Sequence, residues 1–427
     1  MHHFIRVEKA CKTFLIPHTL CDGTRIFLFP SINSFRFFYL ISYLIFIVFW
    51  SFQLFFSIEL QLAEAAEQDV SDSEIPVGTS VPLTGHASYL GIGMVTGMNT
   101  YFNHVNSQGG INGRKIKLTV YDDDYNPPLM ISNVKRLIDK DQVFALIGLV
   151  GTPTTLTVVE MCEKQKIPLL FPFTGAIELR HPIKSYVLNL RPSYWDEGAA
   201  AVDYFIKQGK RRIAVFYQND AYGLNGRNGV ERGLIKYDLS LAAEAWYIRG
   251  ESDVANQVQE IKKSNPDVVV MIGTADPCSA FILEAVRQGM EDVWFSNVSF
   301  VGSHELARRL LDCKATVFVT QVFPSVSDPS FPAVREYRQL MKTYFPSIKP
   351  DQVSLEGFLA AKLFIEALKI NGDNLVNMEK LVRTIEDMHE FDVGIGEKVN
   401  FSRIDHQGLD KVYITRIEDG KIIYLQD

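Results

Sequence analysis

The stretch FALIGLVGTPTTLTVVEMCEKQKIPLLFPFTGAIEL, residues 144–179, predicts a strand, a loop, a helix, a second strand and a second loop. The apolar run at 144–147 stops at Gly148, which is typical of a short buried parallel strand. Thr152 and Pro153 fit a helix N-cap and the first helical position. Apolar residues then recur at near-helical spacing from 155 to 166. Residues 168–171 predict the next buried strand.

Both of these strands end in loops that contain Gly, Thr and Pro. Open parallel sheets bind ligands outside the carboxyl ends of their strands, where a helix start offers unpaired N–H groups and a positive dipole end. We therefore expect the hydroxyls of Thr152 and Thr174 to help bind a carboxylate or other anion. The alternative is that both threonines only cap helices.

Composition limits the class of protein. A chain of 427 residues is long enough for two lobes, and 47% hydrophobic with 22% charged residues is typical of a globular protein. The net charge of −7 and the lack of a Lys/Arg run argue against nucleic acid as a partner.

The first 65 residues differ from the rest and predict a signal peptide or a membrane anchor. Residues 37–58 carry no charge, and residues 1–36 hold more Lys and Arg than Asp and Glu. This bias places the N-terminus in the cytoplasm and the remainder across the membrane. The A-x-A motif at 63–65 favours cleavage over a retained anchor. In both cases we expect residues 66–427 to work in the periplasm or another extracytoplasmic space.

Five cysteines are too few for a disulfide scaffold. Cys11 and Cys21 precede the apolar run. For the other three, buried free thiols are favoured over a Cys278–Cys313 bridge.

Strand and helix patterns alternate from residue 75 to 190 and start again at 196, which predicts an α/β fold with two Rossmann-like lobes and parallel sheets. A linker at 324–329 follows, then helices at 332–344, 352–370 and 378–388. Two short strands at 411–416 and 422–425 around Asp419-Gly420 predict a hairpin.

Catalysis has little support in the sequence. There is no H-E-x-x-H, G-x-S-x-G or P-loop motif, and the histidines are scattered. We expect a protein that is not an enzyme and needs no cofactor or metal. The run Asp122-Asp123-Asp124 fits a solvated strand end better than a cation site.

Several motifs occur together in one order: PLTG at 82–85, GGINGRKIKL at 109–118, the Asp122-Asp123 pair with Pro127, the loop at 148–152, PFTG at 172–175 and QNDAYG at 218–223. From about residue 75 to its end, the chain resembles the leucine/isoleucine/valine-binding proteins of the periplasm, which carry substrates to ABC importers. The resemblance implies a type I periplasmic-binding fold whose lobes close on a small-molecule ligand around a three-crossing hinge. We expect crossings near 191–193, 322–324 and 392–397. The first lobe then holds 75–192 and 323–393, and the second holds 193–322 and 394–427.

The resemblance also implies the site. First-lobe hydroxyls and N–H groups would bind the carboxylate of an amino acid or related acid, and aromatic side chains would form apolar walls. The implied residues are Tyr89, Thr152, Pro153, Thr174 and Gly175 on the first lobe, and Tyr222, Thr274 and Ser299 on the second. The implied partners are the membrane subunits of an ABC importer. A ligand-sensing ectodomain of an anchored receptor is the alternative.

One departure concerns ligand specificity. The family places a carboxylate for the ligand's ammonium group after the strand that is here WFSNVSF, where this chain has Val298 and Ser299. A desolvated ammonium without an anionic partner is costly. Asp196, Asp276 and Glu356 are the candidate substitutes.

Overall fold

The computed structural model describes residues 73–372 and 377–425. The apolar run at 37–58, the cleavage motif at 63–65, Cys11 and Cys21 lie outside the described residues. Within the described ranges, none of the helices combines the length and apolar character needed to cross a membrane.

The first sheet has five parallel strands in the order β2-β1-β3-β4-β5. They are β1 (Glu74–Val81), β2 (Lys115–Asp122), β3 (Ala145–Ile147), β4 (Leu169–Leu170) and β5 (Val187–Leu188). Helices α2 (Ser88–Ser107) and α3 (Pro127–Asp139) pack against β1 and β2. The strand order changes direction between β1 and β3, so the loops after these two strands flank a natural crevice.

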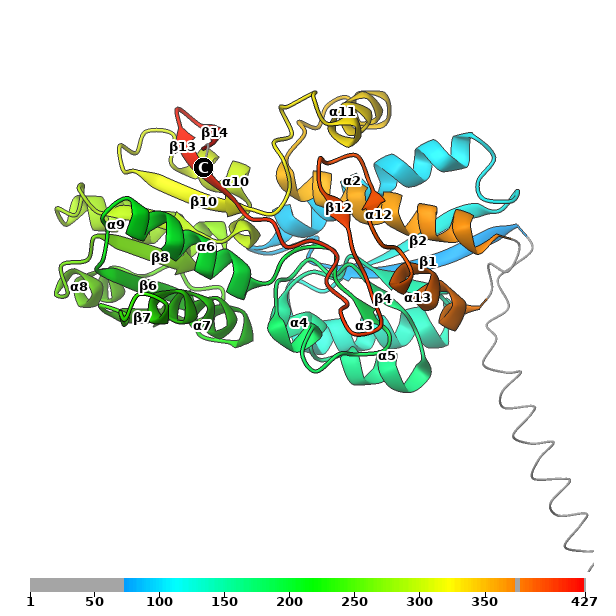
Figure 1. Ribbon diagram of the computed structural model, residues 1–427, viewed down its shortest axis with the longest axis horizontal. Helices are drawn as coiled ribbons and strands as arrows, with labels where there is room; N and C mark the ends of the chain where they lie inside the picture. The colour runs from blue at the N-terminus through cyan, green and yellow to red at the C-terminus, as the bar shows by residue number, and fades with distance from the viewer. Residues whose placement is uncertain (1–72, 373–376, 426–427) are drawn as a thin grey trace, which may run out of the picture. The chain divides into compact units, whose positions relative to one another are not determined.

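The second sheet has the order β14-β13-β10-β9-β8-β6-β7 (Figure 1). Its parallel strands are β6 (Ile213–Gln218), β7 (Glu244–Tyr247), β8 (Val268–Ile272), β9 (Trp294–Asn297) and β10 (Val317–Gln321). The strands β13 (Tyr413–Glu418) and β14 (Lys421–Tyr424) form the predicted antiparallel hairpin. Asp419 and Gly420 turn it with φ of 47° and 72°, which suits a two-residue hairpin loop.

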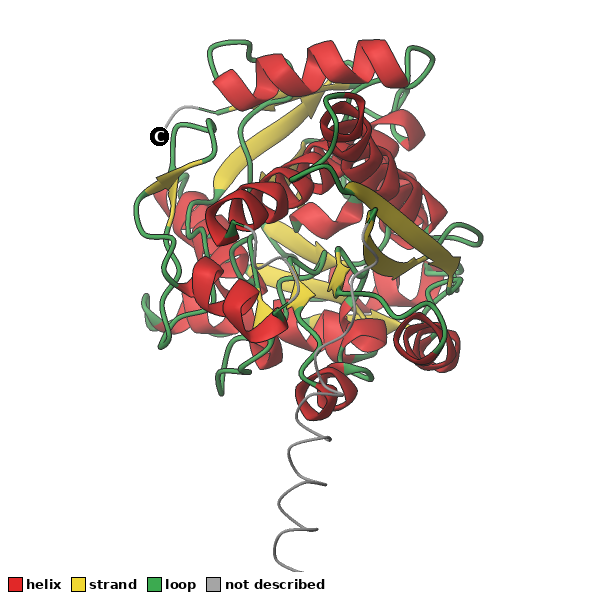
Figure 2. Cartoon of the chain, turned by 90° about the vertical axis from the view of Figure 1, so that its right-hand side faces the viewer, coloured by secondary structure: helices red, strands yellow, loops and turns green. Residues whose placement is uncertain are grey.

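Helices cover both sheets (Figures 1 and 2). In the second they are α6 (Tyr194–Lys207), α7 (Ala221–Ile235), α8 (Ala255–Lys262), α9 (Ala275–Arg287) and α10 (Ser303–Arg309). Three more follow β10, namely α11 (Pro332–Tyr344), α12 (Gln352–Asn371) and α13 (Met378–Glu386). As expected, α12 returns to the first sheet, where it packs along α2.

The predicted helix at 155–166 is divided into α4 (Thr152–Thr155) and α5 (Val159–Gln165), so that prediction was wrong at its start. Thr154 Oγ1 donates to the Val150 carbonyl at 2.5 Å, and Thr157 Oγ1 donates to the Thr154 carbonyl at 2.6 Å. Threonine hydroxyls that bond to nearby backbone compete with helical pairing, and this run of β-branched residues disfavours a continuous helix.

The sequence also missed a two-stranded sheet, β11 (Phe391–Asp392) with β12 (Lys398–Val399). Beyond it, the Asn189 N–H donates to the His406 carbonyl at 2.8 Å, and the Gly408 N–H donates to the Asn189 carbonyl at 2.8 Å. Residues 406–408 therefore lie beside the end of β5.

The prediction of a solvated strand end holds for Asp124, which is exposed, and is wrong for Asp123, which is buried. Asp122 Oδ1 accepts from the Leu83 N–H at 2.8 Å. Asp123 is fully buried and accepts from Ser80 Oγ at 2.8 Å and the Tyr125 N–H at 2.9 Å. These carboxylates tie the loop after β1 to the end of β2. Burial raises the pKa of Asp123 to about 7, against the opposing hydrogen bonds from Ser80 and Tyr125.

Cys162, Cys278 and Cys313 are free thiols, so the prediction of no bridge is confirmed, although Cys313 is only partly buried. A continuous apolar core runs from the first sheet into the second and includes Tyr222 and Phe300. A second core lies under the remaining helices of the second sheet.

Candidate functional site

All eight predicted site residues lie in or just after loops at the carboxyl ends of parallel strands. Tyr89 follows β1, Thr152 and Pro153 follow β3, and Thr174 and Gly175 follow β4. Tyr222, Thr274 and Ser299 follow β6, β8 and β9. Both sheets reverse their strand order near these loops, which is where α/β sheets bind ligands.

On the first sheet, two threonines meet. Thr152 Oγ1 and Thr174 Oγ1 are 2.6 Å apart, and the Ala176 N–H donates to Thr174 Oγ1 at 3.2 Å. Both side chains are fully buried. These hydroxyls from neighbouring loops form one polar pair, as the hypothesis of a shared site requires.

The cap at this loop differs by one residue from the prediction. Gly151 occupies the N-cap position of α4 with φ of 95°, and Thr152 begins the helix. A Cβ on Gly151 would lie 2.2 Å from the Tyr125 ring, so only glycine suits both the φ angle and the space. The Thr152 hydroxyl bonds across to Thr174 instead of capping its own helix.

Pro153 and Gly175 have backbone roles. Pro153 lies in the first turn of α4, where its missing N–H costs no helical bond. The Gly175 carbonyl accepts from the Tyr194 N–H at 2.8 Å, and a Cβ on Gly175 would lie 2.6 Å from that nitrogen. The loop after β4 therefore contacts the start of α6 directly.

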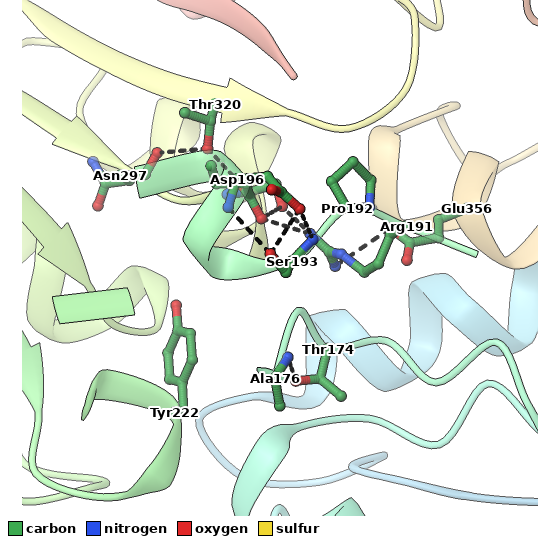
Figure 3. Close-up of polar contacts among 12 residues, drawn as sticks. Thr174, Ala176, Arg191, Pro192, Ser193, Asp196, Tyr222, Asn297, Thr320 and Glu356 are labelled. Atoms are coloured by element: carbon green, nitrogen blue, oxygen red, sulfur yellow. Dashed lines mark hydrogen bonds and ion pairs between the residues drawn. The ribbon is translucent and has the colours of Figure 1, made fainter. Parts of the chain in front are cut away.

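Tyr222 belongs to an aromatic cluster that contacts residues of both sheets. The members of this aromatic cluster are Tyr125, Phe173, Tyr194, Tyr222 and Phe300. The ring centroid of Phe300 lies 4.7 Å from that of Tyr222 and 5.2 Å from that of Phe173, so it bridges the two sheets. Tyr222 also stacks beside Tyr194 at 5.2 Å, and its hydroxyl donates to the Gly273 carbonyl at 3.3 Å. Figure 3 shows Tyr222 and Thr174 on different segments of the chain in this part of the molecule.

Tyr89 bridges the sheets at the other side of the cluster. Its hydroxyl donates to the Val301 carbonyl at 2.8 Å and accepts from the Ala275 N–H at 3.0 Å. The ring packs so closely on Gly302 that a Cβ there would lie 2.4 Å from it. In this conformation the polar end of Tyr89 is bound to the second sheet.

Ser299 belongs to a buried charge cluster, defined as Arg191, Glu197, Ser299, Thr320 and Glu356. The ion pairs of Arg191 measure 3.3 Å to Glu197 and 3.5 Å to Glu356, and all three side chains are buried (Figure 3). Glu197 accepts from the Ser299 N–H at 2.7 Å and from Ser299 Oγ at 3.0 Å. Arg191 also contacts Ser299 Oγ, and the Thr320 hydroxyl donates to Glu197.

Burial shifts the pKa of Glu356 in this cluster and that of Tyr194 beside it. Desolvation raises the pKa of Glu356 to about 7, although Arg191 opposes the shift. Desolvation also raises the pKa of Tyr194 to about 12, again against Arg191.

The candidate substitutes for an ammonium anchor have other partners. Glu356 pairs with Arg191, and Asp276 pairs with Arg309. Asp196 forms the capping box of α6 with Ser193. The structure therefore offers no unengaged carboxylate among these three.

Thr274 sits at the N-cap position of α9, where its N–H donates to Tyr247 Oη at 3.2 Å. On the first sheet, Thr155 in α4 has a buried hydroxyl with no hydrogen-bond partner within the described ranges. A buried hydroxyl without a partner is costly, which marks the turn of α4 as a place for an external group.

Sequence reasoning missed Tyr125, Phe173, Glu197 and Phe300. Aromatic residues near strand ends look the same in a sequence whether they fill a core or line a site. Arg191 and Tyr194 lie beside the predicted hinge. The ion pairs of Arg191 and the ring contacts of Tyr194 could not be predicted from the sequence. In the described part of the chain, no group of three His, Cys, Asp or Glu side chains is placed to hold a metal ion.

Two α/β lobes that meet at the carboxyl edges of their parallel sheets define the type I periplasmic-binding fold. The chain belongs to the periplasmic binding protein family, which it matches over residues 74–421.

Similar proteins carry related names. A solved structure described as a possible leucine/isoleucine/valine-binding protein from Rhodopirellula baltica is 32% identical, with a TM-score of 0.79 over 84% of this chain and 98% of that chain. An amino acid binding protein of Pseudomonas aeruginosa is 25% identical over 55% of this chain and 63% of its own length. The Leu/Ile/Val-binding protein of Escherichia coli is 25% identical over 51% of this chain and 59% of its own. The chain thus spans about three fifths of the length of these two curated relatives.

Proposed function

We propose that this protein is an extracytoplasmic solute-binding protein of an ABC importer. It captures an amino acid or a related small carboxylate between its two lobes and closes over it by hinge motion. It is a carrier without catalytic activity. The names of the relatives support amino acids or similar acids as the ligand class.

The observation that carries this proposal is the pair of hydroxyls of Thr152 and Thr174, 2.6 Å apart beside the start of α4. Their mutual hydrogen bond can be exchanged for bonds to a carboxylate. The aromatic cluster faces them and would form the apolar wall. Because these side chains are fully buried, ligand entry requires the lobes to move apart.

We also propose the lobe boundaries. The first two crossings follow the expectation, near 191–193 and 322–324. The third comes after Gly408, because residues 406–408 still bond to Asn189 beside β5.

Within this ligand class, we expect acids without an ammonium group to bind more tightly than amino acids, because Asp196, Asp276 and Glu356 all have other partners. A thermal-stability screen should compare branched-chain amino acids with 2-oxo acids and aromatic acids of the same size. A ligand at 100 times its Kd adds about 2.7 kcal/mol of stability. The screen should use the protein produced from the full coding sequence and, in parallel, its Thr152→Val variant. Equal shifts for both proteins would remove Thr152 from the site, and the lack of any shift would overturn the proposal.

A second candidate is the sensing ectodomain of a membrane-anchored receptor, favoured by the uncharged run at 37–58. The N-terminal residue of the exported protein decides between the two. A processed terminus near Ala66 removes the receptor.

A further inference from the structure

A pocket lies on the described chain, apart from the Thr152–Thr174 pair and the aromatic cluster. It has a volume of about 660 Å³, and its lining includes Arg180, Trp195, Arg232 and Ile404. None of the eight predicted site residues lines it. Its walls come from the segment after β4, from α6 and α7, and from residues 404–407 beside β5.

Two arginines of this pocket have no carboxylate within 4.0 Å among the described residues. Arg180 is 3% exposed, and its guanidinium donates to the Gln407 side chain at 2.6 Å and to the carbonyls of Ala176 and Arg191 at 2.8 Å. Arg232 lies 4.1 Å from the centroid of the Trp195 ring. Only neutral acceptors contact the Arg180 guanidinium directly, and Asp196 and Glu197 act on its charge from a greater distance. A buried guanidinium without a contacting carboxylate favours an anion in the adjoining space.

The pocket carries an excess of one positive charge. Its lining holds Arg180, Arg232 and Lys236 against Asp196 and Asp405. Asp196 is already engaged, because it accepts from Ser193 and from Gln407 Nε2 at 3.1 Å. The whole chain has a net charge of −7, so a cationic pocket is a local exception. Burial lowers the pKa of Arg180 to about 10, and the nearby Arg191 adds to the effect.

The rest of the lining suits an apolar body with one polar edge. Ile404 is 82% exposed and Ile235 is 64% exposed, which leaves apolar surface at the rim. Trp195 Nε1 is buried without a hydrogen-bond partner within the described ranges. An indole N–H is a donor only, so it needs an acceptor such as a carboxylate oxygen.

We propose that this pocket is a second ligand site, which takes a small organic monocarboxylate whose apolar part rests on Trp195 and the isoleucines. Arg180, Arg232 and Trp195 Nε1 bind its carboxylate. Because segments that follow both sheets line the pocket, its occupancy shifts the balance between hinge positions.

Calorimetric titration of the protein produced from the full coding sequence tests the site, with sodium benzoate as the probe. Arg232→Gln should weaken benzoate binding about tenfold or more, since it removes a charge-assisted hydrogen bond. Trp195→Phe keeps an aromatic ring, removes the indole donor and should weaken binding less. Arg287→Gln, an exposed arginine of α9 outside the pocket, is the matched control and should leave binding unchanged.

Three further titrations separate the alternatives. Benzoate belongs to the class of acids proposed for the Thr152 site, so the titration is analysed for two sites. Thr152→Val should keep the component of benzoate binding that Arg232→Gln loses. The pocket can therefore fail while the proposed function stands, and the reverse. Benzyl alcohol and inorganic phosphate should bind much more weakly than benzoate. Equal binding of either one, no saturable binding of benzoate, or full affinity in Arg232→Gln overturns the proposal. Small-angle X-ray scattering should show that benzoate changes the hinge distribution in the parent protein and not in Arg232→Gln; identical profiles overturn the coupling.

Discussion

Hydroxyl side chains at the carboxyl edges of the two sheets have different hydrogen-bond partners. On the first sheet, the hydroxyls of Thr152 and Thr174 bond to each other and to one backbone N–H. On the second, Ser299 is held by Glu197 and Arg191 inside a buried charge cluster. The first edge carries neutral hydroxyls, whereas Ser299 at the second edge contacts ion pairs that Arg191, after β5, makes with Glu197 and Glu356.

The difference indicates which edge recognises a polar ligand. Exchanging the bond between two threonines for bonds to a carboxylate costs little, because hydrogen bonds are replaced one for one. Recruiting Ser299 would disturb an ion pair that is already desolvated, which is costly. We therefore expect the first edge to bind the charged group and the second edge to supply apolar contact through Tyr222 and Phe300.

The largest effect should come from Arg191→Met. Removing this cation leaves Glu197 and Glu356 buried without a positive partner, so we expect a loss of about 3–5 kcal/mol in the free energy of unfolding, measured with urea. Arg212→Met is the matched control, because its pair with Asp267 is partly exposed and should be worth about 1 kcal/mol or less. Similar losses in both variants would show that the charge cluster stabilises the fold no more than a partly exposed ion pair does.

A smaller effect concerns pH and the same cluster. The pKa of Glu356 is raised from 4.5 to about 7, so the folded state binds this proton more tightly than the unfolded state. The resulting stability is complete below the unfolded pKa and is lost as the pH rises through 7. Relative to Glu356→Gln, the parent protein should lose stability on the order of 3 kcal/mol between about pH 4 and about pH 8.

Denaturation curves of both proteins across this range check the sign. Asp123, whose pKa is also raised to about 7, contributes in the same direction in both proteins, so the comparison cancels it. Parallel pH profiles for the parent and Glu356→Gln would contradict the prediction.

Most of the fold could be predicted from the sequence, whereas half of the candidate site could not. Strand positions follow from short apolar runs between Gly and Pro, and these patterns are local. The pairing of Arg191 with Glu356 joins α12 to the segment before α6, far apart in the chain, and no local pattern reveals it. Phe300 has the composition of a core residue, and only its contacts with both Phe173 and Tyr222 distinguish it.

A third prediction compares how much each of the two edges contributes to ligand affinity. Thr152→Val should weaken binding of the carboxylate found in the stability screen by about 10- to 100-fold, the worth of a hydrogen bond to a charged group. Ser299→Ala should leave affinity nearly unchanged while it lowers stability. Calorimetric titration measures the affinity of both variants for this carboxylate. The opposite order would assign the polar contact to the second edge.

The smallest effects should come from the hydroxyls of Tyr222 and Tyr89. Tyr222→Phe removes one hydrogen bond, to the Gly273 carbonyl at 3.3 Å, and should cost about 1 kcal/mol or less. Tyr89→Phe removes two, and it leaves the Ala275 N–H at the start of α9 without its acceptor. Tyr89 lies in α2, which packs on the first sheet, and both of its partners follow strands of the second sheet. Under the proposed lobe boundaries, this loss should also favour an open hinge. Urea denaturation measures the first effect, and small-angle scattering measures the second. If Tyr222→Phe opens the hinge and Tyr89→Phe does not, the contact that joins the lobes is the aromatic cluster and not the bridge made by Tyr89.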